Sequence, residues 1–470
     1  AELIRAGMRH AAETGVTSVQ TCDLREGSWR TVLEAYNLVM ADHPLTRVSH
    51  QSYFSKPEEY REFLAEGHVT GTGTPFHRFG PLKLFVDGSL GARTAYMRAP
   101  YHDAPETRGI STLTPAQLDA LVGTAVEHHC GVAIHAIGDA AVEEVLDAYD
   151  RVCKDGKNPN RLGIIHVQIT DRPLVERFTK NHILALVQPI FLHYDTTIVE
   201  DRVGKELAAT SYAFGTMKKL GIHMSFGTDS PIEDMNPIDN LYCAVTRSTL
   251  KGSPSFHPEE CVDIYDAVDA YTTESAYATF EEDIKGRLLP GYYADLVVLS
   301  ENIFELPPTE LRRAKVEVTV ASASGSREIV SSHKVHITAD ALAEEVDYSD
   351  VDMVVLPGGI PGTPNLAANK TVTDTCVSFA KSGKKVAAIC AAPSVLASLG
   401  LLEGRKATAH AGFQDKLAGA EVLDTEVVVD GNITTSYGLG GAIPFALELV
   451  RQLAGQAEAD RIQNAIAYRH

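Results

Sequence analysis

Four polar residues stand at the ends of short apolar runs in the first half of the chain: Lys83, His135, His166 and Asp229. Imidazole nitrogens and carboxylate oxygens are ligands that suit a zinc-like divalent ion. A bound metal lowers the pKa of its water, and a nearby aspartate can accept a proton and deliver it to a leaving amine. These residues therefore predict metal-assisted hydrolysis, although an isolated strand-end histidine is more often structural.

Cys390 offers a second chemistry. The stretch KKVAAICAAPSVLASLGLL places this thiol directly after an apolar strand and before a helix of small residues. At such a turn, backbone N–H groups and the helix dipole favour the thiolate, although a buried structural cysteine is an equally good interpretation. The Gly-rich LPGGIPG at 356–362 can add N–H groups for an oxyanion pocket, and His410 in KATAHAGF is a candidate base.

Asp87 and Asp139 follow two of the apolar runs, in Gly-flanked turns. They are candidates for substrate binding. Aspartate in such a turn more often forms the turn or caps a helix.

The elements expected to position the first group alternate strictly. Seven strand-like runs lie between residues 15 and 229, separated by helical patterns such as PAQLDALVGTAVEHH and DAAVEEVLDAYDRV. Alternation of this kind predicts a parallel sheet covered by helices, here a (β/α) barrel one strand short of eight. Barrel enzymes place their chemistry at the carboxyl ends of the strands, where these polar residues converge. The segment KGRLLPGYYADLVVLSENIF then predicts a turn and a strand.

The alternation restarts after about residue 315. VEVTVAS, MVVLPGG, KVAAIC, KATAH and VVVDGNITTS read as strands, with helices over VTDTCVSFAKSG, residues 392–399 and FALELVRQLAG. A second α/β domain of ordinary size is therefore expected, giving domains 1–314 and 315–470.

The length, net charge and cysteine count limit the kinds of partner and cellular location that can be expected. The 470 residues carry a formal net charge of −20, which disfavours nucleic acid and anionic membranes and favours small molecules or cations. Without a long apolar run or a signal-like start, a cytoplasmic location is expected. Seven cysteines without a CxxC pair predict reduced thiols. The first residues resemble the interior of a helix, which would suit a fragment.

Five motifs occur in order over roughly residues 1–320: LKLFVDGSLGARTA, VAIHAIGDAA, IIHVQ, FGTDSPIEDMNP and GRLLPGYYADLVVLSENIFELP. Together they resemble the amidohydrolase superfamily, specifically its YtcJ-like amidohydrolase-3 branch. The resemblance implies that His135 and His166 are metal ligands, that Asp229 is the catalytic acid/base and a further metal-site residue, and that Lys83 occupies the position of a carboxylated, metal-bridging lysine. Zinc is the implied ion.

One departure from that family is large. Its members carry an HxH pair at the end of the first barrel strand, and none of the 18 histidines here forms HxH. A site with two ligands fewer is expected to bind metal poorly, and a barrel without its first strand leaves sheet edges unpaired.

The second half carries its own family motifs. VVLPGGIPGTPNL, AAICAAPSVLASLGLLEGRKAT and TSYGLGGAIPFALELV resemble the ThiJ/PfpI family, over about residues 312–455. The resemblance implies a flavodoxin-like α/β sandwich in which Cys390 is the reactive thiol and the amides of Gly359 and Ala391 line its pocket. The family's first strand and its glutamate, which contacts the thiol, have no counterpart here.

The two resemblances meet in one segment. ELRRAKVEVTV, residues 310–320, fits the end of the first family and the start of the second. We therefore expect a chimera joined within this segment, by recombination or by erroneous joining, rather than two whole domains with a linker.

Three functions remain open from the sequence. The first is a metal-dependent amidohydrolase that cleaves a C–N bond. The second is a cysteine protein of the ThiJ/PfpI type, acting as a deglycase, a glyoxalase or a redox chaperone. The third is a chain in which neither site is competent. Both resemblances make a homodimer plausible, and substrate identity cannot be read from the sequence.

Overall fold

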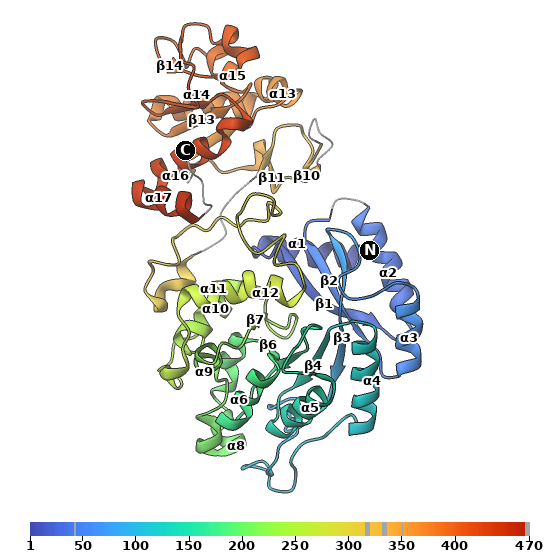
Figure 1. The fold of residues 1–470 in the computed structure, drawn as a ribbon. Coiled ribbons are helices and arrows are strands. Elements are labelled where there is room, and N and C mark those ends of the chain that lie inside the picture. The colour runs from blue at the N-terminus through green and yellow to red at the C-terminus, as the bar shows by residue number, and fades with distance from the viewer. Residues whose placement is uncertain (42–43, 315–319, 331–335, 350, 466–470) are drawn as a thin grey trace. The chain divides into compact units, whose positions relative to one another are not determined.

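The computed structural model describes residues 1–41, 44–314, 320–330, 336–349 and 351–465. It contains two compact units, Ala1–Glu317 and Val318–His470 (Figure 1). Residues 315–319, which hold the predicted domain boundary and most of the predicted strand VEVTVAS, lie outside the described residues.

The first unit is built on a parallel sheet. All neighbouring strands pair in sequence order. This confirms the predicted alternation and the incomplete barrel. The strands are β1 (Ser18–Arg25), β2 (Arg47–Tyr53), β3 (His77–Phe85), β4 (Val132–Ala136), β5 (Gly163–His166), β6 (Leu184–Val187) and β7 (Met224–Phe226).

Most helices bury their apolar faces in one large core, while α1 and part of α2 pack in a smaller cluster around Met8, Tyr36 and Val39. In Figure 1, α2, α3 and α4 lie in succession along one side of the strands. The helices are α1 (Glu2–Glu13), α2 (Trp29–Met40), α3 (Pro57–Ala65), α4 (Pro115–Glu127), α5 (Asp139–Val152), α6 (Arg172–Lys180), α7 (Leu192–Asp195), α8 (Val199–Ala208), α9 (Phe214–Lys219), α10 (Pro237–Thr246), α11 (Ile264–Tyr271) and α12 (Thr273–Ala278), with 3-10 turns η1 (Pro189–Phe191), η2 (Pro258–Glu260) and η3 (Pro308–Arg313).

Local sequence explains where these helices begin and which face they bury. At the start of α4, Thr114 caps the helix, and its side chain and that of Gln117 form a reciprocal capping box. Pro115 occupies the first helical position. In α5 the buried side chains recur at helical spacing, as in Val142, Val145 and Tyr149. The alternating segments therefore form the layers that the periodicity predicts.

The sheet has two open edges within the described residues, because β1 pairs only with β2 and β7 only with β6. It nevertheless curves toward closure. Asp229, just after β7, interacts electrostatically with Cys22 on β1 and Lys83 on β3. The curvature therefore gathers residues from both ends of the sheet.

Within the described residues, one predicted strand is reduced to a single bridge position at Leu299. Residues 293–298 carry no regular structure, and Leu296, Val297 and Val298 are 57%, 42% and 50% exposed. A strand needs a neighbour to satisfy its backbone, and the described residues supply no ladder here. Asp295 still fixes the segment to the sheet, because its carboxylate accepts two bonds from Arg47 at 2.6 and 2.8 Å.

The second unit has a four-stranded sheet in the order β12-β13-β17-β16, with the last strand antiparallel. This is the predicted flavodoxin-like arrangement. Its elements are β12 (Met353–Leu356), β13 (Lys385–Ile389), β16 (Val427–Asp430), β17 (Ile433–Ser436), α13 (Gly362–Ala368), α14 (Lys370–Ser382), α15 (Pro393–Ser398), α16 (Ala442–Ala454) and α17 (Gln456–Ala465).

Short elements complete this unit, and it has a core of its own around Leu356, Cys376 and Leu396. Among the described residues, no helix of the chain has the length and apolarity needed to cross a bilayer. The short elements are β8 (Ala321–Ser322), β9 (Glu328–Val330), β10 (His336–Thr338), β11 (Ala341–Leu342), η4 (Ala343–Glu345), β14 (Lys406–Ala407), η5 (Ala411–Lys416), β15 (Glu421–Val422) and η6 (Leu439–Gly441).

Candidate functional sites

His135 and His166 lie side by side in the first unit. His135 is on β4 and His166 ends β5, and the two strands pair so that Ala136 is opposite His166. The ring centroids are 4.4 Å apart, with an angle of 75° between the ring planes. The ladder between the two strands therefore brings together the two predicted metal ligands.

The bonds around His135 place a proton on one of its two ring nitrogens. Its Nε2 lies 2.9 Å from the carbonyl oxygen of Gly88 and 3.3 Å from Asp87 Oδ1, both of which only accept. Nε2 therefore carries the proton, and in the neutral ring Nδ1 keeps its lone pair. Asp87 is itself held by the backbone N–H groups of Tyr96 and Gly138, at 2.9 and 2.8 Å.

His166 uses its other nitrogen. Its Nδ1 lies 2.7 Å from Gln188 Oε1. Burial, together with the nearby His135 and Lys83, holds the pKa of His166 well below its ordinary value, so the ring is neutral. His166 Nε2 then keeps its lone pair, and it has no hydrogen-bond partner within the described residues.

Lys83 is buried on β3 at 5% exposure. Its ammonium lies 4.6 Å from the ring centroid of Phe85, and no hydrogen bond or ion pair to it occurs among the described residues. Burial lowers the pKa of Lys83 to about 8, against the opposing charges of Cys22 and Asp229. A substantial fraction of neutral amine is therefore present near neutral pH, which the addition of CO2 requires.

Asp229 follows β7 with a φ of 56°, an unusual backbone conformation for aspartate. Burial raises the pKa of its carboxyl, while the charges of Lys83 and His135 oppose the rise. The carboxyl group therefore lies within electrostatic reach of both, and an elevated pKa suits a group that accepts and returns a proton.

Cys22 is a neighbour that the sequence analysis did not identify. On β1, Thr21 and Asp23 bond to each other and to His50 on one face of the sheet. Cys22, between them in sequence, belongs to the opposite face and interacts electrostatically with Lys83 and Asp229. The alternation of side chains along β1 was the feature of the sequence that could have placed Cys22 on this face.

The donor set fits a divalent cation in kind but not in number. Each imidazole has one nitrogen bonded to protein and one left as a ligand, as in known metal sites. No group of three or more His, Cys, Asp or Glu side chains within the described residues is arranged to hold a metal. We therefore expect a weakly held ion, to which a carboxylated Lys83 would add an oxygen ligand.

Asp87 and Asp139 both have structural partners. Asp87 bonds the turn after β4 as described above. Asp139 accepts from the backbone N–H groups of Arg98 and Ala140, at 2.8 and 2.9 Å. Substrate binding by either residue stays a prediction.

In the second unit, Cys390 occupies a strained turn between β13 and α15. Its φ is 65°, in the left-handed region that cysteine rarely adopts. The backbone is held on both sides, because Cys390 N–H donates to the Ser436 carbonyl at 2.9 Å and the Cys390 carbonyl accepts from His410 N–H at 2.9 Å. This is the sharp strand-to-helix geometry expected of an activated thiol.

Two glycines make room for this turn. A Cβ on Gly358 would lie 2.4 Å from Cys390 Cβ, so no side chain fits there. A Cβ on Gly438 would lie 3.8 Å from Cys390 Sγ and 3.6 Å from His410 Cδ2. The thiol and the imidazole therefore border the same glycine.

The other predicted groups of this pocket are also present. The N–H groups of Gly359 and Ala391 have no backbone acceptor in the described part of the chain, so both are available to an oxyanion. His410 Nδ1 accepts from Gly412 N–H at 3.2 Å, which places the proton of the neutral ring on Nε2.

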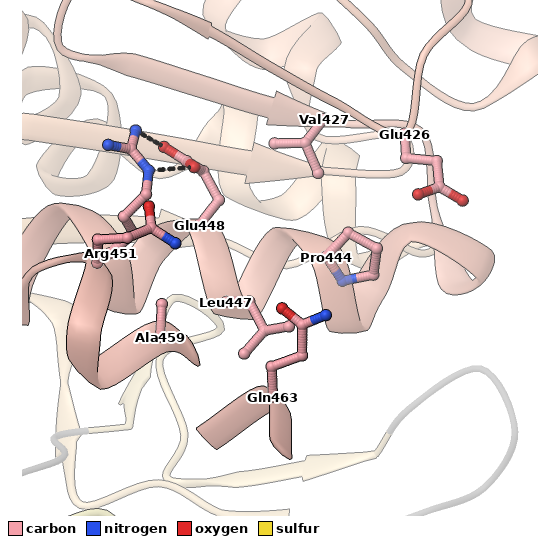
Figure 2. A pocket seen from close by; sticks show the side chains of 9 residues that line it. Glu426, Val427, Pro444, Leu447, Glu448, Arg451, Ala459 and Gln463 are labelled. Carbon is pink, nitrogen blue, oxygen red and sulfur yellow. Dashed lines mark hydrogen bonds and ion pairs between the residues drawn. The ribbon is translucent and has the colours of Figure 1, made fainter. Parts of the chain in front are cut away.

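A further pocket of about 400 Å³ lies between α16, α17 and the start of β16 (Figure 2). The Glu448 carboxylate in it already accepts from Arg451 Nε at 2.7 Å and Gln452 Nε2 at 2.8 Å. It includes none of the predicted site residues. Its lining residues are Glu426, Val427, Pro444, Leu447, Glu448, Arg451, Gln456, Ala459 and Gln463.

The first unit is an incomplete barrel with two adjacent histidines at its strand ends, and the second is an α/β domain with a cysteine at a strand-to-helix turn. Residues 1–322 match the model of the amidohydrolase family and residues 300–452 that of the DJ-1/PfpI family. The chain belongs to the amidohydrolase family over its first part and to the DJ-1/PfpI family over its second. The matches overlap at residues 300–322, which contain the segment ELRRAKVEVTV.

Relatives are known for both parts. YtcJ of Bacillus subtilis, named as an amidohydrolase, is 37% identical over 248 residues, which are 52% of this chain and 46% of YtcJ. Protein dj-1beta of Drosophila melanogaster is 36% identical over 177 residues, 36% of this chain and 95% of that protein. The deglycase TK1284 of Thermococcus kodakarensis is 36% identical over 165 residues, 34% of this chain and 98% of the deglycase.

A solved structure resembles the first part. An uncharacterized metal-dependent hydrolase from Pyrococcus horikoshii is 29% identical, with a TM-score of 0.57, and the alignment covers 65% of this chain and 60% of that one. The chain therefore spans less than two thirds of the hydrolase and less than half of YtcJ.

Proposed function

We propose that the first unit hydrolyses the C–N bond of a non-peptide amide in a small molecule, with a divalent metal as cofactor and zinc as the expected ion. One observation carries the proposal: His135 and His166 are adjacent, and within the described residues each keeps one ring nitrogen free of protein hydrogen bonds. Membership of the amidohydrolase family and the likeness to a metal-dependent hydrolase support it.

His135 and His166 would hold the cation, with Lys83 as its carboxylated form and Asp229 as the remaining candidates. When bound, such an ion would acidify a water molecule and polarise the substrate carbonyl. His135 carries its proton on Nε2 and His166 on Nδ1, and each proton is bonded to a protein acceptor. The lone pairs on His135 Nδ1 and His166 Nε2 would therefore be available to the ion.

Asp229 would move the proton. Its raised pKa allows it to take a proton from the attacking water and to give it to the leaving amine nitrogen. Lys83 and His135 oppose the rise, because both favour the carboxylate, which is the form that acts as the base.

The test is hydrolysis of a simple N-acyl amine by the full chain with added zinc, compared with Asp229→Asn. We expect kcat to fall by roughly 10²–10⁴-fold in the variant, the usual contribution of a general acid/base. Cys390→Ser is the matched control and should leave the rate unchanged. Equal rates in Asp229→Asn and the parent chain, or loss in Cys390→Ser, would refute the proposal.

A second candidate function belongs to the second unit. We propose that Cys390 attacks the carbonyl carbon of a glyoxal-type compound or its adduct. The strained backbone at Cys390, the His410 ring bordering the same glycine, and the amides of Gly359 and Ala391, which have no backbone acceptor among the described residues, support a nucleophile with an oxyanion pocket. The similarity to a deglycase agrees with this chemistry.

Methylglyoxal consumption tests this second function. Cys390→Ser should abolish it, and Asp229→Asn should not affect it. Cys376→Ser is a further control, because this thiol is fully buried and burial raises its pKa to about 11. Consumption that persists in Cys390→Ser would remove the cysteine from the mechanism.

A further inference from the structure

Gln188 lies directly after β6 and is 8% exposed. Its side chain makes two bonds with different partners. Oε1 lies 2.7 Å from His166 Nδ1, and Nε2 donates to the Leu186 carbonyl at 3.1 Å. A buried amide with both ends engaged has a defined orientation.

The Leu186 carbonyl decides that orientation. A carbonyl oxygen only accepts, so the amide NH2 must face it. Turning the amide over would oppose two oxygens and leave a buried acceptor unpaired, which is unfavourable. Gln188 therefore presents an acceptor to His166, and His166 must donate from Nδ1.

From this chain of bonds we propose that Gln188 is the positioning residue for His166, fixing the ring as the Nδ1–H tautomer so that Nε2 is the metal ligand. Phe191 assists, because its ring stacks on His166 at a centroid distance of 5.8 Å and 15° between planes. Rotation of the imidazole out of plane is thereby opposed.

The neighbouring histidine has the opposite arrangement. His135 donates from Nε2, to Gly88 and Asp87, and keeps Nδ1. The two rings thus depend on separate protein acceptors from different strand ends. Loss of the Gln188 amide should free His166 alone.

The tautomer of His166 tests this directly in metal-free protein. Long-range ¹⁵N–¹H spectra of ¹⁵N-histidine-labelled chain, with His166→Gln to assign the signal, should show Nδ1–H in the parent. Gln188→Met, which removes the acceptor, should give a mixture or the Nε2–H form. Gln188→Glu retains an acceptor and should restore Nδ1–H. An unchanged tautomer in Gln188→Met would overturn the proposal.

Zinc affinity is the second readout, and it rests on the proposed metal site. Competition with a chromophoric chelator should show a 10–100-fold loss in Gln188→Met and recovery in Gln188→Glu. Gln168→Met is the matched control, because this buried amide donates to Asp195 at 3.2 Å and not to a histidine. Equal losses in Gln168→Met would mean a general packing effect and would contradict the proposal.

The two readouts separate the hypotheses. The tautomer is measured without metal or substrate, so it stands whether or not amide hydrolysis is found. If Gln188→Met does not fold by circular dichroism, Gln188→Glu decides the matter: its ring must still carry the proton on Nδ1, and any other result contradicts the positioning role.

Discussion

At the residue scale, the candidate metal-site residues could be predicted from their positions at strand ends. Their hydrogen-bond partners could not, because these are set by how the strands pair. The sequence alone shows that the four candidates lie in or after apolar runs: Lys83, His135, His166 and Asp229. Gln188 could not be assigned, because its bond to His166 depends on how β5 and β6 pair. The sequence also cannot show that the Cys390 pocket depends on glycine at position 358.

A buried polar chain on the other face of the sheet predicts acid sensitivity. His77 Nε2 is 2.8 Å from His50 Nε2, and His50 Nδ1 is 3.0 Å from Asp23. Burial and the charge of His50 lower the pKa of His77 to about 4. Burial raises the pKa of Asp23, but hydrogen bonds from His50, Thr21 and Tyr36 outweigh it and lower the pKa of Asp23 to about 2.

Both shifts have the same consequence for stability. The unfolded chain binds more protons than the folded chain between about pH 6.5 and 4 through His77, and between about pH 3.8 and 2 through Asp23. The contribution of these groups to the free energy of unfolding should therefore be fully present above pH 6.5 and should decrease on acidification. The decrease from His77 alone should reach about 3 kcal/mol at pH 4.

His77→Gln removes the titrating group. In urea denaturation between pH 7 and 4, the slope of stability with pH should be smaller for this variant than for the parent chain. His128→Gln, at an exposed position, is the control and should follow the parent. The same slope in His77→Gln and in the parent would show that His77 does not carry the effect.

At the element scale, alternation predicted all seven barrel strands and the strand that ends at Cys390. The strand expected in KGRLLPGYYADLVVLSENIF is seen among the described residues only as a bridge position at Leu299. A β-propensity pattern forms a longer strand only where a neighbour can complete the ladder. Leu296 to Val298 have a suitable pattern and remain exposed.

This exposed segment should promote self-association. Val297→Lys adds a charge to an unpaired apolar stretch and should reduce aggregation in static light scattering. Because Val297 is 42% exposed, the free energy of unfolding should change by no more than about 0.5 kcal/mol. Aggregation unaffected by the charge would show that another surface drives it.

The turn at Cys390 should not tolerate a methyl group at position 358. Gly358→Ala places Cβ 2.4 Å from Cys390 Cβ, and such overpacking costs about 1–3 kcal/mol. Gly362→Ala is the control, since a Cβ there meets nothing within 4 Å. Chemical denaturation compares the two variants, and equal stability would contradict the close approach.

At the scale of the whole molecule, the chain contains two separate cores and two family matches that share residues 300–322. The overlap supports the hypothesis of a junction within ELRRAKVEVTV. It was predictable because both consensus patterns are local in sequence. Whether either site works depends on which ligands and strands accompany it, and composition cannot show that.

Separate cores predict separate unfolding. Calorimetry should show two transitions, with zinc raising only that of the first unit, because a ligand stabilises the unit that binds it. Alkylation of Cys390 should move only the other transition. A single transition that responds to both treatments would show that the units unfold as one.

The central claim is that His135 and His166 hold a divalent ion in an incomplete barrel. Equilibrium dialysis of the full chain against zinc, with Cys390→Ser to exclude thiol binding and His135→Gln/His166→Gln as the comparison, tests it most directly. We expect about one zinc per chain at saturation in Cys390→Ser and none at this site in the double variant. The same zinc binding with and without the two histidines would contradict the account.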